Sequence, residues 1–159
     1  MKIILVFVLF IGLLLSCEQN NNSSSKYESD ISQLKQKLDD IYKPGFGEIM
    51  GFIQHHHAKL WFAGRNENWD LASFEIHELT EGFDDVEKYQ HKRKEAEIIS
   101  MIKPSLDSVR KAVEEKNISQ FKDSYKELTN TCNSCHIATN YEFIEIKVPD
   151  FQPYSNQVF

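Results

Sequence analysis

The stretch that decides the fold is NISQFKDSYKELTNTCNSCH, residues 117–136. Its large apolar side chains and both of its thiols recur at steps of 3, 4, 3, 4 and 3, at Ile118, Phe121, Tyr125, Leu128, Cys132 and Cys135. This spacing marks one face of an α-helix, and asparagine, here Asn117, is a residue type that caps helix N-termini. The stretch therefore predicts a helix that carries both cysteines on its buried face.

The same helix closes with a C-x-x-C-H motif, Cys132 to His136. This pattern is typical of c-type haem attachment, in which two thiols bond to the porphyrin edge and the adjacent imidazole ligates the iron. Cys132 and His136 are four residues apart, so a helix brings the three side chains to one edge. The sequence predicts one covalently bound haem c, held by Cys132 and Cys135, with His136 as proximal axial ligand.

Two other kinds of site use a C-x-x-C pair. A structural zinc site needs a second pair of Cys or His ligands, and the remaining cysteine, Cys17, lies at the far end of the sequence. A thioredoxin-like redox pair stands at the start of a helix that follows a strand, whereas this pair closes a helical pattern. Both alternatives are weaker than haem attachment.

Further amphipathic segments precede this helix. Apolar residues at helical spacing, with charged residues between them, run through 46–60, 69–86 and 99–113, and a shorter segment covers 31–41. Pro104 marks either a kink in the third segment or its true first turn. Four helices with short connections pack as an antiparallel up-down bundle. The predicted fold is all-α, namely such a four-helix bundle with a short extra N-terminal helix and an extended C-terminal arm.

The N-terminus predicts export. One lysine is followed by an apolar run over residues 3–15, which is too short to span a bilayer comfortably and is typical of a signal peptide. The run ends in Leu-Leu-Ser-Cys17, which resembles the bacterial lipobox. We therefore expect residues 1–16 to be a lipoprotein signal peptide and Cys17 to be lipidated. The alternative is an ordinary secretory signal with an incidental cysteine.

Charge and composition divide the rest of the chain. The formal net charge is −6, and loss of the single lysine in residues 1–16 makes it −7, which argues against a nucleic-acid partner. Residues 17–27 are polar and predict a flexible tether. Residues 28–140 form the predicted haem-binding bundle. Residues 141–159, which begin with alternating apolar and charged side chains, form the predicted arm over the haem edge.

At this point the chain resembles the class II cytochromes c, the cytochrome c′ superfamily. The resemblance covers roughly residues 45–140. It rests on a C-x-x-C-H motif near the end of the last helix, on the number of predicted helices and on the layout Phe121, Tyr125, Cys132. It implies a monohaem, four-helix-bundle c-type cytochrome. Because many members of this family dimerise, a homodimer is one of the states that it implies.

The second axial ligand follows from the predicted topology. In an up-down bundle the end of the last helix lies beside the start of the first, so the first turns of segment 46–60 face the iron opposite His136. Met50 lies there on the inward stripe, and the low-spin branch of the family uses a methionine in this region. We expect Met50 to be the distal axial ligand. Alternatively, it packs beside an open, five-coordinate iron.

The other histidines and the charged residues give weaker predictions about function. The triplet His55, His56 and His57 cannot converge on one metal ion, since consecutive helix residues point about 100° apart; His57 is expected to be a buried, hydrogen-bonded core residue. Glu75 and Glu78 are expected on a solvated helix face. One basic cluster is either a docking patch for an acidic redox partner, a counter-charge for the haem propionates or a solvated turn: Lys88, His91, Lys92, Arg93 and Lys94.

The expected function is electron transport by a lipid-anchored monohaem cytochrome with His/Met ligation. It would face the periplasm as a membrane lipoprotein of the bacterial cell envelope, exchange electrons with redox partner proteins and have no enzyme activity. The alternative is a five-coordinate, cytochrome c′-like protein that binds or senses small gases such as NO or CO. Haem peroxidase chemistry is a weaker third reading, because no well-placed distal acid–base pair is predicted.

Overall fold

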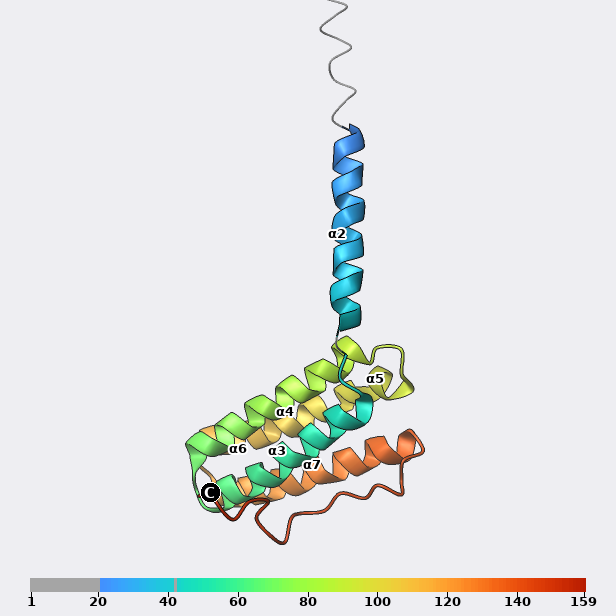
Figure 1. The fold of residues 1–159 in the computed structure, drawn as a ribbon. Coiled ribbons are helices and arrows are strands. Elements are labelled where there is room, and N and C mark those ends of the chain that lie inside the picture. The colour runs from blue at the N-terminus through green and yellow to red at the C-terminus, as the bar shows by residue number, and fades with distance from the viewer. Residues whose placement is uncertain (1–20, 42) are drawn as a thin grey trace, which may run out of the picture. The chain divides into compact units, whose positions relative to one another are not determined.

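The computed structural model describes residues 21–41 and 43–159, so the predicted signal peptide and Cys17 lie outside the described residues. Every regular element in the described ranges is a helix, and they contain no strand, which confirms the all-α prediction. The elements are shown in Figure 1: α2 (Asn21–Ile41), α3 (Phe46–Arg65), α4 (Trp69–Tyr89), α5 (Lys94–Ile98), the 3-10 helix η2 (Ile99–Ile102), α6 (Lys103–Glu114) and α7 (Ile118–Ala138).

The described residues fall into two units, which divide between Lys43 and Pro44. Two predicted boundaries differ from this division. Residues 21–27, expected to be a flexible tether, belong to α2, because no proline or glycine interrupts the helix that the amphipathic segment behind them supports. Residues 28–43, expected in the bundle, fall in the first unit, because Pro44 and Gly45 end the helical pattern. The C-terminal residues 141–159 belong to the second unit.

Two connections between helices share one design. Asn68 and Asn117 cap α4 and α7, and their side chains accept hydrogen bonds from Leu71 N at 3.3 Å and Gln120 N at 3.1 Å. The residue directly before each cap, Glu67 or Lys116, has a left-handed backbone conformation, with φ of 60° and 52° respectively. Each pair ends one helix and starts the next within a few residues, which keeps the connections short, as predicted.

The long helices of the second unit pack in pairs. α3 contacts α4 and α7, and α6 contacts α4 and α7 (Figure 1). The faces in contact carry the predicted stripes, since Leu60, Ile76, Val109 and Phe121 are fully or almost fully buried. Pro104 stands in the first turn of α6, so the second of its two predicted roles is correct.

The direction of α7 relative to α3 follows from contacts at their two ends. Near the end of α3, Gly64 lies against the ring of Phe121 from the first turn of α7. Near the start of α3, Met50 lines the same cavity as Cys132 from the last part of α7. The last residue, Phe159, packs on Phe62 at the Gly64 end, with 5.9 Å between ring centroids. The cavity therefore lies at one end of the unit and the chain terminus at the other.

The prediction for Glu75 was wrong. Glu75 is fully buried between α4 and α3, where its Oε2 lies 2.6 Å from His56 Nδ1 and its Oε1 lies 2.6 Å from Lys59 Nζ. The reason is its place on the inward stripe, one helical step after Ala72 and one before Leu79. A carboxylate can occupy that stripe because Lys59 and His56 of α3 each contact one of its oxygens. Glu78 is half-buried, 3.8 Å from His56 Nε2.

Candidate functional site

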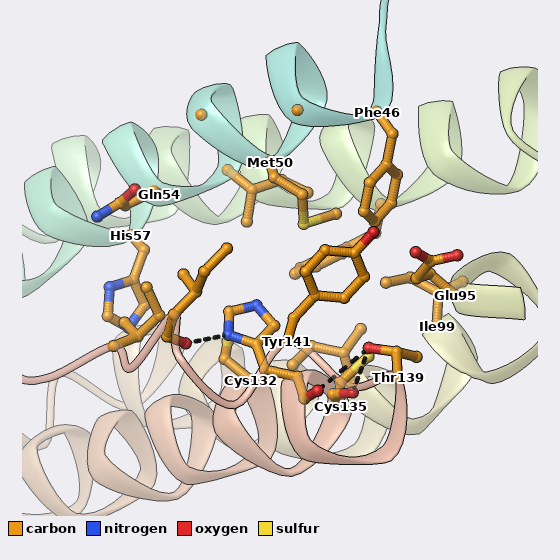
Figure 2. Close-up of a pocket in the computed structure, with 18 of the residues that line it drawn as sticks. Phe46, Met50, Gln54, His57, Glu95, Ile99, Cys132, Cys135, Thr139 and Tyr141 are labelled. Carbon is orange, nitrogen blue, oxygen red and sulfur yellow. Dashed lines mark hydrogen bonds between the residues drawn. The ribbon is translucent and has the colours of Figure 1, made fainter. Parts of the chain in front are cut away.

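A cavity of about 530 Å³ opens at the end of the second unit where α3 begins and α7 ends (Figure 2). Helices α3, α4 and α7, the η2 turn and the arm after α7 all contribute to its lining, which is mostly apolar. Its volume is within the range of sites for small molecules and cofactors. The cavity brings together all the iron and haem ligands predicted from the sequence: Met50, Cys132, Cys135 and His136.

The two thiols are shielded rather than activated. Both cysteines of the described part are free, and burial raises the pKa of Cys132 to about 12 and also raises the pKa of Cys135. Redox-active pairs have lowered pKa values and stand at helix N-termini, whereas this pair stands near the C-terminus of α7, where the helix dipole disfavours a thiolate. The thioredoxin-like alternative is therefore at odds with the environment of both thiols.

His136 is oriented by the arm that follows α7. Its Nδ1 lies 2.6 Å from the carbonyl oxygen of Ile144, so Nδ1–H donates and Nε2 carries the lone pair. The chain returns over the histidine because Asn140 is left-handed, with φ of 64°, and Tyr141 N donates to the His136 carbonyl at 2.7 Å. A histidine with Nδ1–H bonded to a backbone carbonyl is the usual arrangement of a metal-ligating imidazole.

Asn133, between the two cysteines, holds the arm through two hydrogen bonds. Its Nδ2 donates to the carbonyl of Ile146 and its Oδ1 accepts from Ile146 N, both at 2.8 Å. Ile144 and Ile146 in turn line the cavity. Sequence reasoning predicted an arm over the haem edge but missed this clamp, because an asparagine between motif cysteines carries no signal of a partner that lies 13 residues later.

On its α3 side the cavity is lined by Met50 with a glycine on each side of it, and by the side chains of Phe46, Ile53, Gln54 and His57. Gly47 and Gly51 are one helical turn apart and line the cavity, and a Cβ added at either would meet nothing within 4 Å. Figure 2 shows Met50 pointing from α3 into the cavity toward the side on which Cys132 and Cys135 lie. A flat macrocycle needs open space of this kind, and a thioether is a ligand that iron accepts. The residues present fit a haem.

The rim carries the polar groups. Arg93 donates from Nη2 to Glu95 at 2.7 Å and to the hydroxyl of Tyr141 at 3.1 Å, and its guanidinium lies 4.6 Å from the centre of the Phe46 ring. The hydrogen bond from Arg93 lowers the pKa of Glu95. Arg93, unlike the neighbouring Lys94, lines the cavity; Lys94 instead donates to the carbonyl of Ala138 at the end of α7, at 3.0 Å.

His57 lines the cavity and is buried, as predicted. Its Nε2 lies 3.0 Å from Thr129 Oγ1 and its Nδ1 lies 3.0 Å from the hydroxyl of Tyr125. Thr129 Oγ1 donates to the carbonyl of Tyr125 at 2.9 Å, so it accepts from Nε2–H of the imidazole. Burial lowers the pKa of His57 to about 4, which keeps the ring neutral at physiological pH. The Tyr125 hydroxyl also donates to the His57 carbonyl at 2.8 Å, so both ring nitrogens of His57 lie within hydrogen-bond distance of α7 hydroxyl oxygens.

The three consecutive histidines have different partners. His55 contacts the hydroxyl of Tyr154 and His56 pairs with Glu75, while His57 bonds to α7. Within residues 21–41 and 43–159, no group of three or more Cys, His, Asp or Glu side chains is placed to hold a metal ion. The three side chains of the triplet thus turn to three different neighbours.

None of the described helices combines the length and the apolar character that crossing a membrane requires. Compared with known proteins, the chain matches no family model, no curated protein and no solved structure. The candidate site therefore stands on its own residues and their geometry.

Proposed function

We propose that this protein is a lipid-anchored, monohaem c-type cytochrome that carries electrons in the bacterial cell envelope. Cys132 and Cys135 would hold the haem through thioethers, and His136 and Met50 would be its axial ligands. One observation carries the proposal: an apolar cavity joins the C-x-x-C-H motif to a methionine on the facing helix, and Gly47 and Gly51 leave open space on that helix beside the methionine.

The proposal includes the finer architecture, an antiparallel up-down four-helix bundle of α3, α4, α6 and α7. It is supported by the contacts of α3 and α6 with both α4 and α7, and by the opposite pairing of helix ends at Gly64 and at Met50. Such a bundle holds its cofactor between facing helices. The likeness to class II cytochromes c remains part of this proposal.

The residues around the cavity have separable roles. A bound haem would supply a one-electron couple. The Ile144 carbonyl accepts from Nδ1–H of His136, which leaves Nε2 to face the cofactor, and a thioether ligand from Met50 would favour the reduced state and raise the potential. The apolar lining excludes water, and the ion pair of Arg93 and Glu95 places polar groups at the rim. No residue here needs to move a proton, which suits a carrier rather than an enzyme.

The cellular setting is proposed from the sequence. Residues 1–16 would direct export and Cys17 would anchor the mature chain in the membrane, facing the periplasm. Partners would be redox proteins of the envelope that dock near the cavity, where basic residues from 88 to 94 stand out in an acidic chain. Nucleic acid is not a proposed partner.

A second function, binding or sensing of NO or CO at five-coordinate iron, has an observation in its favour. Met50 is only half-buried, and the Gly51 position beside it leaves open space on the same wall. A small gas would fit there if the sulfur did not ligate. The two proposed functions differ in whether the sulfur of Met50 would ligate the iron.

The experiment is to express the full chain with c-type haem maturation in a periplasm and to record oxidised and reduced spectra with a pyridine haemochrome assay. Covalent haem with a low-spin reduced spectrum, unmoved by carbon monoxide, supports the carrier. Absence of covalent haem contradicts both functions.

Met50→Ala then separates the two functions. We expect loss of low-spin character and a new response to carbon monoxide, because the iron loses a ligand. Met101→Ala is the matched control, since Met101 also lines the cavity but from η2, and its spectrum should be unchanged. A high-spin spectrum that is the same in wild type and Met50→Ala identifies the gas-binding alternative.

A further inference from the structure

Helix α2 carries an apolar stripe that a lone helix cannot bury. Tyr27, Ile31, Leu34 and Leu38 are 66, 52, 59 and 66 % exposed. Their steps of 4, 3 and 4 continue by 3 to Ile41 in the sequence. This alternation is the a and d pattern of a heptad repeat, with Ile31 and Leu38 at a, and Tyr27, Leu34 and Ile41 at d.

We propose that α2 pairs with α2 of a second copy of this chain as a parallel, two-stranded coiled coil. Ile31 at a followed by Leu34 at d is the combination that favours two strands, whereas Leu38 at a followed by Ile41 at d favours more than two, so the choice of two strands rests on the first of these heptads and on the width of the stripe. Positions b, c and f of the central heptad are Ser32, Gln33 and Gln36, so the opposite face is polar and needs no partner. The stripe is narrow, as a two-helix seam is.

Charge at the seam edges fits a parallel pair. Asp30 occupies position g and Lys35 occupies position e of the next heptad. In a parallel dimer, each g residue faces the e residue five positions later on the partner helix, so Asp30 of one copy faces Lys35 of the other, twice per dimer. The seam thus has opposite charges on both sides of its Ile31 and Leu34 layers.

The length of α2 explains where this pairing would occur. Its 21 residues span about 31 Å at 1.5 Å per residue, fewer than four heptads, so two free chains would associate weakly. If Cys17 anchors each chain, as the proposed function holds, both helices start at the same membrane. Anchoring raises their effective concentration and aligns them in parallel. The pairing itself does not depend on haem.

The test is cysteine cross-linking of the full, haem-loaded chain in membranes with a mild oxidant. Leu34→Cys places a thiol at d, where parallel helices bring the two copies together, and Gln36→Cys is the matched control at the outward f position. We expect a covalent dimer with Leu34→Cys at least several-fold more abundant than with Gln36→Cys. Equal cross-linking at both positions reflects random collision and overturns the proposal.

An exchange of charged residues at the seam provides a second test. In the Leu34→Cys background, Asp30→Lys should reduce the dimer, because it opposes two lysines at each edge, and Asp30→Lys with Lys35→Asp should restore it. A helix that lay on the membrane or on the same chain would give no dimer in either case, which overturns the proposal. Haem spectra of all variants should equal those of wild type, so failure of this pairing and failure of the proposed function remain distinguishable.

Discussion

At the scale of single residues, the polar groups buried in the second unit are matched to partners on facing helices. His57 of α3 is neutral and bonded to Thr129 and Tyr125 of α7, while Glu75 of α4 is paired with His56 and Lys59 of α3. A buried polar group is stable only while its partner is present and its protonation state suits the bond. A change of protonation or a substitution in either set should therefore alter the free energy of unfolding measurably.

The stability of the protein should fall as the pH falls from about 6.5 to 4. The pKa of His57 is about 4 in the folded chain and 6.5 in the unfolded chain, so in this window the unfolded state binds more protons. Full stability is present above pH 6.5, and about 3 kcal/mol is lost by pH 4. Urea unfolding from pH 8 to 4 measures the slope.

His57→Gln should flatten that dependence, because glutamine does not titrate. His77→Gln is the control: His77 is exposed and pairs with Glu81 on the surface, so its loss should leave the slope as it is. If His57→Gln keeps the slope of wild type, His57 is not the group responsible.

Removal of the Glu75 charge should destabilise the second unit. Glu75→Gln leaves Lys59 without its anion in a buried position, and breaking one partner of such a pair costs about 3–5 kcal/mol. Glu78→Gln is the matched change on the same helix at a half-buried site, and we expect less than about 1 kcal/mol there. Urea denaturation at pH 7 compares the two, and equal effects would contradict an essential role for the buried cluster.

At the scale of elements, the contact of α3 with α7 depends on the absence of a side chain at one position. A Cβ at Gly64 would lie 2.2 Å from Phe121 Cζ, and the Phe121 ring is itself fully buried between Trp61 and Trp69. Neither the ring nor the backbone has space to move. The close approach of the two helices therefore requires glycine there for packing, with ordinary helical backbone angles.

Gly64→Ala should cost about 1–3 kcal/mol of unfolding free energy, as overpacking of a filled core does. Gly51→Ala, in the interior of the same helix but with nothing within 4 Å, should gain about 0.5–1 kcal/mol from helix propensity. Thermal unfolding of the two variants without cofactor gives opposite signs if the contact with Phe121 is the cause. A stabilised Gly64→Ala would show that α7 can shift at low cost.

At the scale of the whole molecule, the arm of residues 141–159 closes the unit from both ends. Asn133 and His136 hold it beside the cavity, and at the other end Asn66 donates to the Phe159 carbonyl at 3.1 Å while Phe159 itself is buried. The arm has no helix or strand of its own. Side chains of α3 and α7 hold the arm in position. Release of these contacts should therefore loosen the arm and change access to the cavity.

Asn133→Ala should loosen the arm without unfolding the helices. It removes two hydrogen bonds at 2.8 Å to Ile146, and we expect faster proteolytic cleavage within residues 141–150, by about an order of magnitude. Ser134→Ala is the neighbouring control, because Ser134 is exposed and bonds within its own helix to Asn130. Mass spectrometry locates the cut. Equal cleavage in both variants would mean that other contacts hold the arm.

Local pattern was sufficient for the long helices of the second unit. Apolar spacing, Asn68 and Asn117 caps and Pro104 predicted the positions of these helices to within about five residues, because these are short-range properties of the chain, whereas α2 begins ten residues before the predicted segment. The same reasoning placed Met50 and the C-x-x-C-H motif at one end of the unit, and the structure brings them to one cavity.

Tertiary structure alone decided what the buried polar residues contact and that Glu75 is among them. Glu75 was expected to be solvated and is buried, because its partners Lys59 and His56 come from another helix. The bonds from Asn133 to Ile146 and from His136 to Ile144 join positions 13 and 8 residues apart that only the turn at Asn140 brings together. Periodicity reports which face of a helix turns inward. The partner that this face meets depends on chain segments distant in sequence, which only the folded packing specifies.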